Sequence, residues 1–182
     1  MNLIPADELN ILEQKFTRQK EENSLKPEQA IDEVLDILIL AYLYGTVAAN
    51  SMLDTDIAVD ENDMFTTINK DIAGKTYADR VREYAEKGDV YGIARVAETD
   101  THRVYNHAVQ TVAEKSNRNV RKLWRTEMDD KVRDTHSYLE GMSVGLNERF
   151  FTYDGDSALY PGNFALAENN ANCRCVIELI TE

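Results

Sequence analysis

Apolar residues recur every three to four positions through the first half of the chain, the spacing that places them on one face of a helix. Near the amino terminus this repeat is carried by Leu9, Ile11, Leu12 and Phe16. The pattern predicts a first helix that packs against the rest of the protein by one face.

A second helix is predicted to begin near Pro27, because proline is favoured in a first helical turn. It leads into the stretch from Ile37 to Leu53, which has no acidic or basic side chain and is apolar on nearly all sides. The stretch is shorter than the ~20 strongly apolar residues that cross a bilayer, so a buried helix is favoured over a membrane span. Two explanations for its burial compete: it forms the centre of the chain's own bundle, or it meets a larger assembly.

Turn and capping residues divide the next segment into three helices. An acidic loop over residues 54–63 precedes a helix that Gly74 is expected to end. Thr76 and Asp79 form a capping pair at the following helix, and Asp89 can cap the third, which runs toward Asn117. The inward face of this third helix is expected to carry Tyr91, Ile93, Ala94, Ala97, Val104, Ala108 and Val112.

After Asn117 the pattern changes to short alternating segments separated by turns. A short helix is predicted over residues 129–139, ended by Gly141. Strands are predicted at residues 120–125, around Val144, at Phe150-Phe151 and at residues 176–180.

These elements predict an α+β fold for the 182-residue chain. A mainly helical N-terminal two thirds, residues 1–117, is followed by a small α+β module with a short antiparallel sheet, residues 118–182. The chain contains no internal repeat or low-complexity linker, so the two regions are expected to form one folded unit.

Composition limits the class of partner. Net charge is −13, from 33 acidic against 20 basic side chains, so the average surface potential repels phosphate backbones and broad nucleic-acid binding is not expected. The nearest approach to a basic patch surrounds Trp124 and consists of Arg118, Arg121, Lys122 and Arg125. Exposed residues of a sheet edge are favoured there over a local phosphate contact.

The chain's two cysteines, Cys173 and Cys175, lie too close in sequence for an unstrained disulfide, and a reducing compartment fits better. On a strand both would point to one side, where His136 can approach them. Asp129 and Arg133 are spaced to share a face of the short helix with His136.

A cluster of His136, Cys173 and Cys175, completed by Asp129 or by water, matches the four nitrogen, sulfur or oxygen ligands that zinc prefers. Such a zinc ion would be structural and would hold a small sheet together. The competing interpretation is that the cysteines are buried as small hydrophobic side chains and that no cofactor is required.

A catalytic interpretation has two candidate pairs. A thiol can lie near His136, or Glu98 and His102, one helical turn apart, can act as acid and base. The chain contains no phosphate-binding glycine loop, nucleophile elbow or His-Glu-x-x-His run that would fix such a geometry. A protein without enzymatic activity is therefore favoured.

Five aromatic residues lie between the short helix and the cysteines: Phe150, Phe151, Tyr153, Tyr160 and Phe164. Core filling is the default for such a group, and one or two members can instead mark a partner-binding surface. The sequence does not assign which.

The order of particular residues in the C-terminal third is the most specific signal. It runs through Trp124, Asp129, Arg133, His136, Gly141, Pro161, Asn172, Cys173 and Cys175. This order resembles the phage minor head protein family, also called the Mu F-like or head-morphogenesis family. The similarity extends from about Ile68 to Cys175, with Ala97 standing where many members have a hydroxyl residue, and the chain is short for the family.

The resemblance implies a structural minor head protein of a tailed phage or prophage, found in the virion and, during assembly, in the host cytoplasm. Its partners would be portal or capsid proteins, contacted through residues 1–117, and residues 118–182 would be the head-morphogenesis module. No membrane association is implied. Because similar domains are also found attached to toxin domains, the rival is a metal-dependent hydrolase or toxin-like enzyme module.

Overall fold

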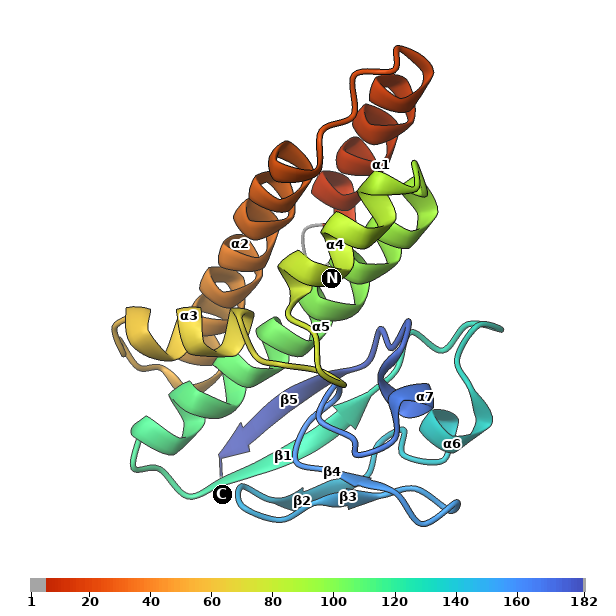
Figure 1. Ribbon diagram of the computed structural model, residues 1–182. Helices are drawn as coiled ribbons and strands as arrows, with labels where there is room; N and C mark the ends of the chain where they lie inside the picture. The colour runs from red at the N-terminus through yellow and green to blue at the C-terminus, as the bar shows by residue number, and fades with distance from the viewer. Residues whose placement is uncertain (1–5, 182) are drawn as a thin grey trace.

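A helical bundle lies against a small sheet region in the computed structural model, which describes residues 6–181 (Figure 1). The helices are α1 (Ala6–Glu21), α2 (Pro27–Leu53), α3 (Glu61–Ile68), α4 (Tyr77–Glu86), α5 (Val90–Lys115), α6 (Asp134–Ser137) and α7 (Ala167–Asn170). The strands are β1 (Val120–Arg125), β2 (Ser143–Gly145), β3 (Phe150–Phe151), β4 (Ser157–Ala158) and β5 (Val176–Thr181). This order confirms the predicted α+β fold.

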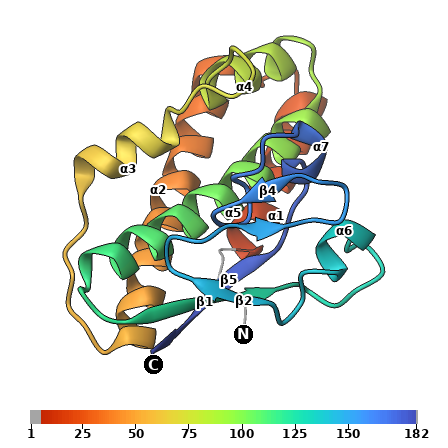
Figure 2. The same ribbon diagram turned by 90° about the horizontal axis from the view of Figure 1, so that it is seen from below.

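The bundle is built around α2 and α5, which lie side by side (Figures 1 and 2). Gly45 permits their close approach, since a Cβ there would lie 2.4 Å from the carbonyl oxygen of Tyr105. Burial of Leu38, Ala41 and Ala49 places one face of the apolar stretch in the chain's own core, as the first of the two explanations predicts. Tyr44 and Val47, on another face of the same helix, are exposed. Across residues 6–181, no helix is long and apolar enough to cross a membrane.

The predicted helix starts are present. Thr76 and Asp79 form a reciprocal capping box at α4, and the Asp89 side chain accepts a hydrogen bond from the backbone N–H of Gly92 at α5. The helix expected to run to Gly74 is shorter, because α3 ends at Ile68. Residues 71–75 instead form a tight turn in which the Asp71 carboxylate accepts a hydrogen bond from the backbone N–H of Gly74.

Two residues predicted to face inward are exposed instead. Ile11 is 64% exposed on α1 and Tyr91 is 78% exposed on α5. Each is adjacent in sequence to the residue that is buried, Leu12 or Gly92, and one residue along a helix turns the side chain by about 100°. The helices were therefore predicted correctly, but the edges of their buried faces were not.

β1 is the central strand of a three-stranded antiparallel sheet with the order β2-β1-β5, and β3 and β4 form a separate hairpin (Figure 2). The prediction that its basic residues lie at a sheet edge was therefore wrong. Alternate β1 side chains, including Lys122 and Trp124, are buried. Arg125 forms ion pairs with Glu140 and Glu178, so its charge is balanced by neighbouring carboxylates.

The helix predicted over residues 129–139 is wrong in its bounds, since α6 covers only Asp134–Ser137. The Asp129 side chain accepts a hydrogen bond from the backbone N–H of Lys131, and Met128 has a positive φ of 54°. Both features belong to turns, and a short polar side chain that bonds the nearby backbone competes with helix formation. Asp129 and Arg133 consequently do not share a helix face with His136.

Candidate metal centre and its surroundings

His136 is held between aromatic rings at the centre of the C-terminal module. Its ring stacks on that of Phe164 with centroids 5.2 Å apart and meets the Trp124 ring edge-on at 5.6 Å. Trp124 comes from β1, His136 from α6 and Phe164 from the loop before α7, and all three are buried. Three segments distant in sequence therefore fix the orientation of the imidazole.

Cys173 and Cys175 face the same ring nitrogen of His136. Each Sγ lies 3.5 Å from Nδ1, and the ligand atoms of the three residues all lie within 4.8 Å of one another. Both cysteines are buried and free of a disulfide. They precede β5 rather than lying on it, so the strand prediction for them was wrong. The turn at Asn172, with a φ of 54°, brings the two thiols together instead.

The donor set and its spacing fit zinc. In a tetrahedral site with Zn–S near 2.3 Å and Zn–N near 2.05 Å, sulfur and nitrogen lie about 3.5 Å apart, which is the separation between Nδ1 and each Sγ here. A cavity of about 10 Å³ adjoins the cluster and is lined in part by Glu127 and Arg133. That volume is enough for about one water molecule beside the three side chains.

Contacts within the cluster distinguish the two thiols. The hydrogen bond with Cys175 lowers the pKa of Cys173 against the effect of burial, and His136 adds to the lowering. The same hydrogen bond, together with burial, raises the pKa of Cys175. The contact between the two thiols and the neighbouring His136 thus favour a thiolate within this pair.

The charged motif residues beside the cluster connect loops. Asp129 forms a bidentate ion pair with Arg174, with nitrogen–oxygen distances of 2.6 and 2.8 Å. This interaction lowers the pKa of Asp129 to about 2. Its carboxylate is thus directed at Arg174 rather than at the thiols. Arg133 donates to the carbonyl oxygen of Ala171 at 2.6 Å. Both contacts tie the loop before α6 to the segment that carries the cysteines.

The remaining motif residues shape turns or fill the core. Gly141 has a φ of 74° and donates its backbone N–H to the carbonyl oxygen of Trp124 at 3.0 Å. Asn172 donates its backbone N–H to the hydroxyl of Thr99 on α5 at 3.1 Å. Pro161 is buried in the loop after β4. The family pattern therefore marks residues that build the module around the cluster.

The second catalytic pair considered, Glu98 and His102, does not form an acid-base contact. Nδ1 of His102 lies 2.9 Å from the backbone oxygen of Glu98, not from its carboxylate. This contact spans one helical turn and satisfies the imidazole locally. Glu98 and His102 are therefore neighbours on one face of α5 without a contact between their side chains' acid and base groups.

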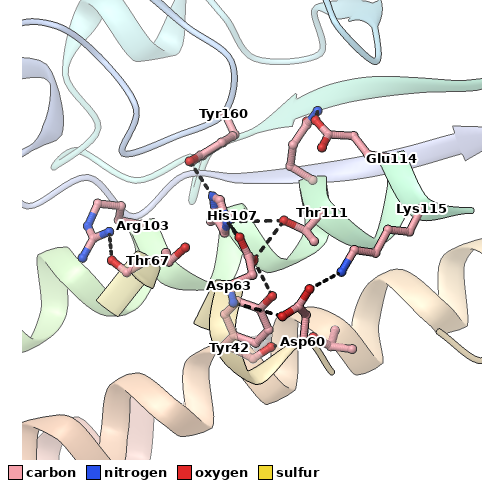
Figure 3. A network of polar contacts seen from close by, with 12 residues as sticks. Tyr42, Asp60, Asp63, Thr67, Arg103, His107, Thr111, Glu114, Lys115 and Tyr160 are labelled. Carbon is pink, nitrogen blue, oxygen red and sulfur yellow. Dashed lines mark hydrogen bonds and ion pairs between the residues drawn. The ribbon is translucent and has the colours of Figure 1, made fainter. Parts of the chain in front are cut away.

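A polar network that the sequence did not reveal joins the bundle to the module (Figure 3). His107 on α5 lies 2.8 Å from the Tyr160 hydroxyl through Nδ1 and 3.0 Å from Asp63 through Nε2. Tyr42 donates to the same Asp63 carboxylate at 2.6 Å. Burial alone would raise the pKa of Asp63, but hydrogen bonds from Tyr42 and His107 lower it below its usual value. No local motif links these residues, so only the fold identifies them.

The aromatic residues of the module separate into two groups. Phe150, Tyr160 and Phe164 are buried, whereas Phe151 and Tyr153 are 63% and 62% exposed. The Tyr153 ring meets that of Tyr138 edge-on, with centroids 5.9 Å apart. Core filling therefore accounts for three of the five, and the other two lie on the surface.

The fold and the cluster define a class: a helical bundle joined to a small α+β module that closes around a buried His-Cys-Cys cluster. The chain belongs to the phage Mu protein F like family, which it matches over residues 64–178. The match begins in α3 and ends in β5, so it includes the cluster, the network residue His107 and every residue of the C-terminal pattern. The family resemblance seen in the sequence is confirmed.

Two curated proteins are similar to part of this chain. The chain is 34% identical over 113 residues to an NAD(+)–arginine ADP-ribosyltransferase, EFV, of Enterococcus faecalis, covering 59% of this chain and 23% of the relative. It is 28% identical over 111 residues to minor head protein GP7 of Bacillus phage SPP1, covering 58% of this chain and 36% of the relative. The chain thus spans about a quarter to a third of these proteins. No solved structure is significantly similar to it.

Proposed function

We propose that this chain is a head component of a tailed phage or prophage, carried in the virion at the portal region or capsid interior, and that it aids head morphogenesis. The observation that carries the proposal is the family match over residues 64–178. Similarity to the minor head protein of phage SPP1 supports the same role. Portal or capsid proteins are the proposed partners, and the chain would bind them in the host cytoplasm during assembly.

Two exposed apolar surfaces support a role in protein contacts. On the module, Tyr138, Phe151 and Tyr153 are exposed, and on α2 so are Tyr44 and Val47. Aromatic side chains are enriched in protein interfaces, where they bury large areas at low entropic cost. Virion partners are the proposed occupants of these surfaces.

The test is incorporation into particles. Mass spectrometry of purified virions and procapsids should detect the chain, and a paired Phe151→Ser and Tyr153→Ser variant should be incorporated less. Tyr91→Ser, which removes an even more exposed aromatic from α5, serves as the control. Absence of the wild-type chain from both kinds of particle would refute the proposal.

Within this role we propose that His136, Cys173 and Cys175 hold a structural zinc ion, with water as the fourth ligand. Bound zinc would link α6 to the segment before β5 and stabilise a module whose sheet has only short strands. About one zinc per chain is expected in purified protein, and a chelator should lower the Tm. His136→Ala and Cys173→Ser should lose the metal, whereas His102→Ala should keep it.

Substitution of the cluster can also prevent folding, so cobalt provides a second readout. Added to metal-free wild-type protein, Co²⁺ should give the thiolate charge-transfer absorption of cysteine ligation. A folded, metal-free protein whose Tm does not change with zinc, and which shows no such absorption, would overturn the zinc proposal.

An enzyme is the second candidate, favoured by the water-sized cavity beside the cluster and by Glu127 on its wall. A metal-bound water next to a carboxylate is an arrangement used in hydrolysis. ADP-ribosyl transfer is named for one relative, of which this chain spans 23%. The zinc-loaded chain is expected to show neither ester hydrolysis nor NAD⁺ cleavage. Activity that is lost in Glu127→Gln would establish the enzyme instead.

A further inference from the structure

A cavity of about 640 Å³ lies between α4, α5 and the loop that leads into α7. This volume is typical of ligand-binding sites. His136, Cys173 and Cys175 do not line the cavity, so it is separate from the candidate metal centre.

The charge of the cavity wall is opposite to that of the protein. Four basic side chains and two acidic ones line it, although the whole chain has a net charge of −13. The basic residues are Lys70, Arg80, Arg95 and Arg103, and the acidic ones are Asp71 and Asp100. An anion would therefore be attracted to this cavity and repelled by most of the surface.

Two of the arginines share a single buried carboxylate. Nη2 of Arg80 donates to one oxygen of Asp100 at 2.6 Å, and Nε of Arg103 donates to the other at 3.3 Å. The Asp100 side chain is fully buried, and that of Arg103 is only 5% exposed. Two guanidinium groups against one carboxylate leave an excess positive charge in a region of low dielectric constant.

Arg103 also has a donor without an acceptor. Its Nη1 donates to the carbonyl oxygen of Thr67 at 2.8 Å (Figure 3), while the buried Nη2 has no partner in the described part of the chain. An unsatisfied buried donor is destabilising, most of all on a charged group. The Nη2 atom itself is closed off from solvent, so what the wall offers a second anion is its excess positive charge.

Other parts of the cavity lining are apolar, and the loop that contributes to them is held in place. Val96, Phe164 and Ala167 contribute to the lining. The Asn170 amide donates to the carbonyl oxygen of Phe164 at 2.8 Å and accepts from its backbone N–H at 2.9 Å. Because these bonds fix the loop in the absence of a ligand, little ordering is needed on binding.

We propose that this cavity binds a short acidic peptide segment of a partner protein. A carboxylate of the segment meets the arginine wall, and neighbouring apolar side chains pack against Val96 and Phe164. The cavity is larger than a lone carboxylate or phosphate requires, and its apolar side would leave such an ion without partners. The inference stands whether or not the partner is a head protein.

Isothermal titration of the full chain tests the proposal with three probes: a capped pentapeptide in which leucine alternates with glutamate, the same peptide with glutamine, and inorganic phosphate. The glutamate peptide should bind saturably, and more weakly as salt is added. The glutamine peptide and phosphate should each bind at least about tenfold more weakly, as expected when one charge-assisted hydrogen bond or the apolar contact is lost.

Variants locate the binding. Lys70→Gln and Arg95→Gln, at exposed positions of the wall, should each lower the affinity for the glutamate peptide about tenfold. Ala167→Trp should fill the apolar side and abolish peptide binding. Arg18→Gln makes the same charge change on α1, outside the cavity, and should have no effect. The proposal is overturned if the glutamate peptide does not bind, or if it binds no better than the glutamine peptide or phosphate. It is also overturned if the cavity variants leave the affinity for the glutamate peptide unchanged.

Discussion

Lys122 places an ammonium group inside the C-terminal module. Its Nζ donates to the carbonyl oxygens of Glu148 at 3.0 Å and Leu159 at 2.7 Å, and it lies 5.6 Å from the centroid of the Phe150 ring. Burial lowers the pKa of Lys122 to about 8. A single side chain thereby joins β1 to the loops that flank the β3–β4 hairpin.

The Lys122 ammonium makes stability depend on pH. Because its folded pKa of about 8 lies below the unfolded value of 10.5, the unfolded chain binds more protons between these pH values. The free energy of unfolding should therefore rise across this window, by on the order of 2–3 kcal/mol. Urea unfolding at several pH values measures the rise, which should be absent in Lys122→Met. The exposed Lys131→Met is the control, and parallel profiles for wild type and Lys122→Met would contradict the prediction.

At the scale of elements, the contact between α2 and α5 depends on Gly45. A Cβ at this position would lie 2.4 Å from the Tyr105 carbonyl oxygen and 2.9 Å from the Ala108 Cβ. Gly45→Ala should therefore force the helices apart and lower the free energy of unfolding by about 1–3 kcal/mol, despite alanine's higher helix propensity. Chemical denaturation tests this. Val47→Ala, at an exposed position of α2, should change stability little, and a stabilised Gly45→Ala protein would show that the helices can separate freely.

The short helix α3 is attached to α2 and α5 through Asp63. Asp63→Asn removes the charge that Tyr42 and His107 contact, and should weaken the attachment by about 1–3 kcal/mol. Amide hydrogen exchange measures this weakening: relative to wild type, the Asp63→Asn variant should exchange faster in α3 than in the rest of the bundle. The exposed Asp56→Asn is the control. Since the folded pKa of Asp63 is lowered, its contribution is present above the unfolded value of 3.8 and is lost as pH falls below it. Unchanged exchange at neutral pH would contradict the role of Asp63.

At the scale of the whole molecule, the bundle and the module share one interior. The buried Asn106 on α5 donates its amide to the carbonyl oxygen of Cys175 at 3.0 Å and accepts from the backbone N–H of Ile177 at 2.9 Å. The contact between His107 and Tyr160 adds a second link. Displacement of α5 would therefore disturb the segment that carries the two cysteines.

The acidity of the molecule leads to a prediction about the genome that fills a phage head. With a net charge of −13, and with Arg118, Arg121 and Arg125 engaged in ion pairs or hydrogen bonds, the chain should bind duplex DNA weakly. Fluorescence anisotropy with labelled duplex at low and moderate salt measures this affinity. Tight binding that weakens steeply with salt would show a cationic surface that the overall charge conceals.

The sequence by itself determined the helical front, the capping box at α4, strands β1, β2, β3 and β5, and the family, because these depend on local spacing and on residue order along the chain. It also selected His136, Cys173 and Cys175 as a group, since histidine and cysteine are the usual ligands of one metal. Only the tertiary structure decided that β1 is central, that Lys122 is buried and that Asp129 pairs with Arg174. The cavity beside Arg103 was equally hidden in the sequence. Each of these depends on segments that lie far apart in the chain and meet only when the core closes.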